Sequence, residues 1–206
     1  MVIGLMILTA IPTVTGVAQA ISGQKKREEQ AQEEKRMQKF HIDIICEADA
    51  PIVQKEIHGH RIVLRDDRVF IGEAQATNPS SEGYVAEAFY IEYPDKERNP
   101  VPLGLVSQTR ADPPLLNWIY VDNDTAELKY GNKSQSIEHR VGPWDWTKDE
   151  TYVKFAKAQL FVAVENPKTK KWQLYWDNDE DGLSKYCPLK WKKVYVTLER
   201  TIIPGT

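Results

Sequence analysis

The chain has 206 residues, of which 41% are hydrophobic and 28% are charged, proportions typical of a globular protein with one main domain. The formal net charge is −3 and the pI is about 5.9, with acidic and basic residues scattered along the chain. No broad positive field exists to hold a phosphate backbone, so nucleic acid is not an expected partner. Cys46 and Cys187 lack CxxC spacing, and either one long-range disulfide or two free thiols would fit.

The N-terminal segment, residues 1–24, contains no charged side chain and is followed at once by "KKREE". It is long enough to span a bilayer as a helix, since roughly 20 apolar residues suffice. It also carries an Ala18-Gln19-Ala20 cleavage pattern, but it lacks the positive start of a secretory signal. The sequence is consistent with three interpretations of this segment: a retained anchor, a cleaved signal or a soluble helix. We expect a membrane anchor with the body in the cytosol, because Lys25, Lys26 and Arg27 follow the segment; secretion is the alternative.

The next segment, residues 25–40, predicts a charged helical stalk. It is rich in good helix formers, and Lys25 and Glu29 lie one turn apart. Ala31, Met37 and Phe40 are its only apolar residues, too few for a buried stripe.

After Phe40 the hydrophobic pattern changes from helical to alternating, which predicts a β-rich domain over residues 41–206. In "HIDIIC" the side chains of Ile42, Ile44 and Cys46 share one face, so Cys46 is expected in the core. About nine or ten short strands separated by turn residues predict an antiparallel β-sandwich or barrel. The expected strand segments are "HIDIIC", "RIVLRDDRVFIGE", "YVAEAFYIEY", "PLGLVSQT", "NWIYVD", "AELKYG", "AQLFVAVEN", "KWQLYWD" and "KKVYVTLE".

Three hairpins are expected, with turns at residues 65–67, near Asn123 and at residues 166–169. Near the C-terminus, alternation predicts which side chains face the core. These are Trp172, Leu174 and Trp176 in one strand, and Val194, Val196 and Leu198 in the last.

Three stretches, "GLVSQTRADPPLLNWIYVDNDTAELKYGN", "VGPWDW" and "FVAVENPKTKKWQLYWDNDEDGL", carry a family resemblance. Over most of residues 100–183 the chain resembles a group of uncharacterised fungal proteins of similar length. The resemblance implies a fungal source and no particular activity, cofactor or site residue.

The stretch "WDNDEDGL" crowds acidic side chains ahead of a glycine. Asp177, Asp179, Asp181 and Gly182 fit the first half of an EF-hand calcium loop. The final position, which needs a bidentate Glu, is Pro188, and the flanking segments are strands, so an EF-hand is excluded. A solvated turn and a weak calcium site, with a dissociation constant no better than about 10⁻⁴ M, both remain open. No other cofactor is expected.

Histidine and cysteine offer two further candidates. His58 and His60 flank Gly59, a spacing that lets two imidazoles reach one zinc ion with His139 as a distant third ligand. Cys187 stands between Lys185 and Lys190, which would lower its pKa if the ammonium groups lay close. No GxSxG, P-loop, GxGxxG or HExxH motif is present.

Aromatic residues provide the best candidate binding surface. Trp191 and Tyr195 are predicted to face outward near the last strand, and Trp144 and Trp146 follow Pro143 in an expected loop. We predict that these four side chains bind a ligand; a second packed layer covered by the stalk or a loop is the alternative.

These features favour a non-catalytic β-rich interaction domain that binds a protein or glycan and is tethered or delivered by residues 1–24. A metal-dependent hydrolase or calcium-binding β domain, and a structural membrane-proximal adaptor, are the alternatives.

Overall fold

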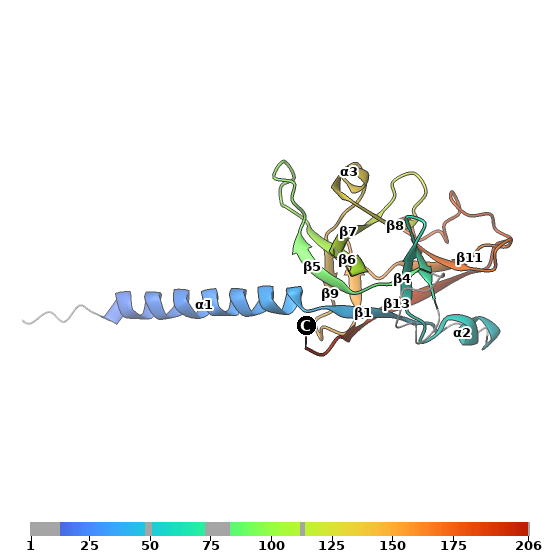
Figure 1. Ribbon diagram of the computed structural model, residues 1–206. Coiled ribbons are helices and arrows are strands. Elements are labelled where there is room, and N and C mark those ends of the chain that lie inside the picture. Colours follow the sequence, from blue (N-terminus) through green and yellow to red (C-terminus); the bar gives the residue numbers. More distant parts are fainter. Residues whose placement is uncertain (1–12, 48–50, 73–82, 112–113, 206) are drawn as a thin grey trace, which may run out of the picture. The chain divides into compact units, whose positions relative to one another are not determined.

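The computed structural model describes residues 13–47, 51–72, 83–111 and 114–205 (Figure 1). The chain divides into two compact units, Met1–Arg36 and Met37–Thr206. The first unit holds nearly all of helix α1, and the second holds the strands.

Helix α1 runs from Thr13 to Met37 and covers most of the predicted charged segment. Lys25 Nζ lies 3.8 Å from Glu29 Oε1, and the side chains of residues 24–35 are exposed. The role of this helix as a stalk stays a prediction. Residues 1–12, the start of the predicted anchor or signal, lie outside the described residues. Within the described part of the chain, no helix combines the length and the apolar character needed to cross a bilayer.

The described part of the second unit consists of strands of two to ten residues with two short helices between them. In chain order its described elements are β1 (Phe40–Ile45), α2 (Pro51–Ile57), β2 (Ile62–Arg65), β3 (Arg68–Ile71), β4 (Tyr84–Val85), β5 (Ala88–Glu92), β6 (Leu103–Ala111), β7 (Pro114–Val121), β8 (Leu128–Gly131), α3 (Lys133–Ser136), β9 (Trp144–Trp146), β10 (Val153–Phe155), β11 (Phe161–Glu165), β12 (Trp172–Trp176) and β13 (Lys193–Ile202).

Nine of these strands close into an antiparallel barrel. Their order is β12–β11–β13–β1–β5–β6–β7–β8–β3, and β3 pairs again with β12 through Phe70 and Gln173. The ladder between β1 and β13 runs from the pair Phe40 and Ile202 to the pair Ile45 and Thr197. The predicted barrel is therefore confirmed. The sandwich alternative is wrong, because β3 pairs with β12 and the large sheet therefore closes on itself instead of packing against a second large sheet.

Other strands extend the barrel. β2 pairs with β3, and β4 pairs with β2. β9 and β10 form a separate hairpin, and a bridge between Tyr152, the residue before β10, and Glu199 joins this hairpin to β13. The short elements α2, α3 and β9–β10 have no counterpart in the sequence prediction, and the expected strand "YVAEAFYIEY" divides into β4 and β5.

The predicted core faces are confirmed. Ile42, Ile44 and Cys46 are fully buried, and Val196 and Leu198 of β13 face the same core. The core side chains of β12 are also as predicted, namely Trp172, Leu174 and Trp176. Cys46 and Cys187 are both buried and both free, so the two-thiol alternative holds.

The three predicted hairpins are confirmed as β2–β3, β7–β8 and β11–β12. In the β2–β3 turn, Asp66 and Asp67 have φ values of 50° and 60°. Two successive positive φ values are typical of the tight turns that match the right-handed twist of a hairpin.

Candidate functional site

Trp144 and Trp146 lie in the barrel core. The Trp144 indole Nε1 donates to Ile119 O at 3.1 Å, and its ring packs against Phe155. The ring of Trp146 lies under the Arg200 guanidinium, with 4.4 Å between Arg200 Cζ and the ring centroid. Their predicted exposure on a loop is wrong, because β9 turns both indoles inward, where burial of a large aromatic surface stabilises the fold.

The other two predicted aromatics occupy a different region. Trp191 is half-buried and packs against a satellite cluster that includes Cys187. Tyr195 is 49% exposed, as predicted, and its hydroxyl donates to Asp177 Oδ2. Partial burial and this bond to a carboxylate raise the pKa of Tyr195 to about 12. With two of its members in the core, the predicted four-residue patch does not form.

The acidic loop uses its carboxylates to hold its own turn. Asp177 is buried and accepts from the backbone N–H of Gly182 at 2.8 Å and of Asp181 at 3.3 Å. Asp179 pairs with Lys185 at 3.0 Å, and Asp181 accepts from Ser184 N at 3.1 Å. Hydrogen bonds from Asn178 and Lys185 lower the pKa of Asp179, and those from Ser184 lower the pKa of Asp181.

Metal ligation finds no support in the geometry. In residues 13–47, 51–72, 83–111 and 114–205, no three His, Cys, Asp or Glu side chains converge as metal ligands. This includes Asp177, Asp179 and Asp181, which point to separate donors. The histidines are also dispersed: His58 Nδ1 accepts from Cys46 N, whereas the ring of His139 stacks on Tyr120 with 5.1 Å between centroids.

Cys187 does not have the lowered pKa expected from its flanking lysines. Burial raises the pKa of its thiol, and the cation that acts against this effect is Lys193, not Lys185 or Lys190. A buried thiol with a raised pKa is a poor nucleophile.

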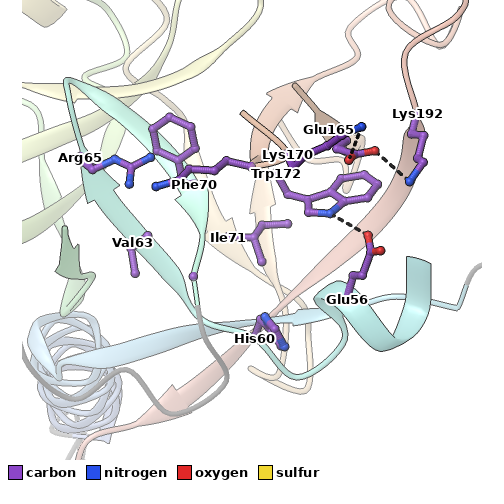
Figure 2. A pocket seen from close by; sticks show the side chains of 12 residues that line it. Glu56, His60, Val63, Arg65, Phe70, Ile71, Glu165, Lys170, Trp172 and Lys192 are labelled. Carbon is purple, nitrogen blue, oxygen red and sulfur yellow. Dashed lines mark hydrogen bonds and ion pairs between the residues drawn. The ribbon is translucent and has the colours of Figure 1, made fainter. Parts of the chain in front are cut away.

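A hollow with a volume of about 520 Å³ opens beside Trp172 (Figure 2). Its walls come from α2 and the segment that joins it to β2, from the β2–β3 hairpin, from the β11–β12 hairpin with its turn, and from the residue before β13. They are formed by Glu56, His60, Val63, Arg65, Phe70, Ile71, Gly72, Glu165, Lys170, Lys171, Trp172 and Lys192.

A second hollow, of about 620 Å³, adjoins the first and shares Arg65, Phe70 and Lys171 with it. It adds Asp66, Arg68, Gly83, Asn166, Thr169 and Gln173. Because the two hollows share walls, we treat them as one site, the Trp172 groove.

The aromatic side chains of the groove are fixed by polar contacts. The Trp172 indole Nε1 donates to Glu56 Oε2 at 3.2 Å, as Figure 2 shows. The Arg65 guanidinium lies over the Phe70 ring at 4.7 Å from its centroid. Gly72 leaves room for Val63, since a Cβ at Gly72 would lie 2.6 Å from Val63 Cγ1.

Glu165 holds two lysines at the rim of the groove. Its Oε2 lies 2.9 Å from Lys192 Nζ, and its Oε1 lies 3.5 Å from Lys170 Nζ (Figure 2). The hydrogen bond from Lys192 outweighs the effect of burial and lowers the pKa of Glu165, while the same contact raises the pKa of Lys192. The Glu165 side chain is 7% exposed, whereas those of Lys170 and Lys192 are 70% and 51% exposed. The ammonium groups therefore face solvent while their counter-ion is buried.

Sequence reasoning missed this groove. The alternating pattern assigns Trp172 to the core, and "NPKTKK" indicates only a hairpin turn. The sequence feature that could have pointed to the groove is the pair Lys170 and Lys171 directly before a tryptophan that begins a strand. The contributions of Glu56 and Phe70 come from distant segments and have no local signature.

The family model described as "Fungal beta-trefoil domain" matches residues 16–204. This match agrees with the fungal resemblance over residues 100–183 and extends it to most of the chain. No curated protein matches the chain, and neither does any solved structure.

Proposed function

Because the chain belongs to the fungal beta-trefoil domain family, we propose that it is a non-catalytic binding domain whose ligand docks in the Trp172 groove. β-trefoil domains often bind proteins or glycans, which supports recognition as the general role.

The observation that carries the proposal is an open groove whose walls are held in place before any ligand arrives. Trp172 is bonded to Glu56, Arg65 is stacked on Phe70, and two lysines are bonded to Glu165. Side chains that are already ordered lose little conformational entropy on binding. Apolar side chains such as Phe70 and Ile71 lie beside many charged and polar side chains in the groove, and convergent polar groups of this kind fix the orientation of a bound ligand.

The chemistry of the groove supports binding over catalysis. Glu165 has a lowered pKa and is held by two ammonium groups, so it is ionised near neutral pH and cannot serve as a general acid. Glu56 already accepts from the Trp172 indole. The residues that form the groove include no serine or cysteine, and Thr169, in the turn between β11 and β12, carries their one aliphatic hydroxyl.

Chemical-shift mapping on the full chain tests the proposal. Neutral oligosaccharides, acidic oligosaccharides and short peptides are added in turn while backbone amide shifts are recorded. We expect a ligand to shift the amides of residues 68–72 and 165–173. Phe70→Ala should weaken that ligand about tenfold or more, since it removes an aromatic wall.

Tyr195→Ala is the matched control, because it removes an exposed aromatic outside the groove and should leave affinity unchanged. Near-ultraviolet circular dichroism checks that both variants fold. Shifts centred on Tyr195, with affinity lost in Tyr195→Ala and kept in Phe70→Ala, would place the site elsewhere. No shift with any member of the panel would contradict a binding role at this groove.

The N-terminal segment belongs to the same proposal. Residues 1–24 tether the domain to a membrane with the body in the cytosol, or direct its secretion if they are cleaved. The uncharged stretch followed by Lys25, Lys26 and Arg27 supports the first role. N-terminal sequencing of protein from membrane and soluble fractions distinguishes the anchor from the cleaved signal. An intact chain in the membrane selects the anchor, a soluble chain that begins at Ile21 selects secretion, and an intact soluble chain contradicts both.

A further inference from the structure

We propose that the ligand of the Trp172 groove is an anionic saccharide, one that carries carboxylate or sulfate groups. This inference rests on the proposed function and adds the chemical class of the ligand.

The first observation is the local charge. Five basic residues and three acidic ones line the groove, and Arg68 is also paired with Glu127 at 3.2 Å, which leaves a small positive excess within a chain of net charge −3. The basic residues are Arg65, Arg68, Lys170, Lys171 and Lys192; the acidic ones are Glu56, Asp66 and Glu165. A charge excess of opposite sign to the whole chain favours an anionic ligand at this site.

The second observation is that the groove's own carboxylates are engaged. Glu165 is almost fully buried beneath Lys170 and Lys192, and Glu56 accepts from the Trp172 indole. Asp66 lies 3.4 Å from the Arg65 guanidinium. A ligand anion therefore meets cations that are held in place by carboxylates behind or beside them.

The third observation is the donor capacity of the two rim lysines. An ammonium group has three N–H donors, and Glu165 accepts from each of these lysines. Lys170 and Lys192 are mostly exposed, so their remaining donors can reach a ligand. Charge-assisted hydrogen bonds from N–H to a carboxylate or sulfate oxygen are about twice as strong as neutral ones.

The neutral part of the groove favours a saccharide. Phe70 and Ile71 are half-buried and offer apolar contacts for the C–H face of a sugar ring, while Trp172 is mostly buried beside them. Gln173 lies in the wall of the second hollow and is mostly buried. Its Nε2 has no hydrogen-bond acceptor within the described chain. Because this Nε2 atom is enclosed, a sugar hydroxyl in the second hollow would supply the missing acceptor only if the Gln173 side chain turned toward it.

Matched pairs of ligands test the charge requirement. Calorimetric titrations of the full chain use an oligogalacturonide and its methyl ester, and a heparin oligosaccharide and its desulfated form. An oligoglutamate serves as a non-saccharide anion. We expect one or both of the charged saccharides to bind about tenfold or more tightly than the uncharged counterpart, with affinity that falls as salt is added.

Charge-matched variants locate the effect. The double variant Lys170→Gln and Lys171→Gln keeps Lys192 on Glu165 and should lose about tenfold or more in affinity. Lys148→Gln with Lys190→Gln removes the same charge from exposed positions outside the groove and should change affinity less than about twofold. Thermal unfolding of each variant checks the fold.

The outcomes separate this inference from the proposed function. Equal binding of a charged saccharide and its uncharged counterpart, with shifts in the groove, would overturn the anionic requirement and leave the binding role intact. If oligoglutamate bound more tightly than the charged saccharides, the assignment of a saccharide as the ligand would be overturned. Equal losses in the two double variants would show a non-specific charge effect and overturn the inference. If none of these anionic ligands binds but another ligand shifts the amide resonances of the groove, the anionic-saccharide inference is overturned and the binding role stands. If no ligand binds at the groove, both the inference and the proposed function are overturned.

Discussion

Asp122 shows how one buried carboxylate organises a turn. It follows β7, and its side chain is 7% exposed. Its Oδ2 lies 2.8 Å from Lys129 Nζ, and its Oδ1 accepts from Thr125 Oγ1 at 3.0 Å. Burial raises the pKa of Asp122, but the hydrogen bonds from Lys129 and the Thr125 side chain and backbone outweigh burial and lower the pKa to about 2.

Because the folded pKa lies below the ordinary value of 3.8, Asp122 stabilises the fold above that pH and loses this effect as pH falls toward about 2. Asp122→Asn should lower the free energy of unfolding by about 1–3 kcal/mol near neutral pH. The difference in the free energy of unfolding between the native protein and the variant should become smaller as the pH falls from 3.8 toward about 2. Denaturant titrations at several pH values measure it, with the exposed Asp124→Asn as control. A gap that stays constant would contradict the ionic role.

At the same scale, sequence alone could not place the tryptophans. Pro143 and the short apolar run around Trp144 and Trp146 are consistent with either a loop or a strand. Which way the indoles point depends on the pairing of β9 with β10, which is set by residues such as Phe155 farther along the chain. The groove could not be predicted for the same reason, because the contact between Trp172 and Glu56 joins residues 116 positions apart in the sequence.

Strand β6 illustrates the constraints on an element. Gly104 pairs with Ile91 of β5 and lies against Trp118 of β7. A Cβ at Gly104 would lie 2.5 Å from Trp118 Cζ3. The indole is mostly buried and packs edge-on against Tyr93 at a centroid distance of 4.7 Å, so it has little room to move.

Gly104→Ala should therefore lower the free energy of unfolding by about 1–3 kcal/mol through overpacking. In a Trp118→Leu background the same substitution should cost less, because the clashing ring atoms are gone. A double-mutant cycle by denaturant unfolding measures the difference. An equal loss in both backgrounds would show that the indole is not the cause.

Elements with regular alternation were predictable because each strand carries its own period. β1, β12 and β13 follow the expected faces, and the three hairpins have turn residues between their strands. Short elements were not. α3 spans Lys133–Ser136 and depends on a capping box between Asn132 and Gln135, which is too short to produce a hydrophobic period.

For the whole molecule, closure of the barrel links the ends of the second unit. β1 pairs with β13, and β3 completes the ring through single residue pairs to β8 and β12. Sequence patterns predicted strands and their antiparallel pairing but left sandwich and barrel open. The three pairings that complete the barrel, β1–β5, β3–β8 and β3–β12, each involve one pair of residues, which leaves no local signal in either strand.

Closure predicts that the second unit unfolds cooperatively. Cys46 lies in the main core and Cys187 in the satellite cluster, and both are buried. Their labelling by a thiol reagent should follow the same denaturant curve as tryptophan fluorescence. Mass spectrometry of the labelled peptides reports each cysteine separately. Labelling of Cys187 at lower denaturant, before the fluorescence changes, would show that the satellite cluster opens independently.

The Trp172 groove is the place where we propose that a ligand binds. The direct measurement is a crystal structure of the full chain with the tightest-binding oligosaccharide. We predict a sugar ring against Phe70 and Ile71, with an acidic group within hydrogen-bond distance of Lys170, Lys171 or Lys192. A ligand bound beside Tyr195, with the Trp172 groove empty, would contradict the account.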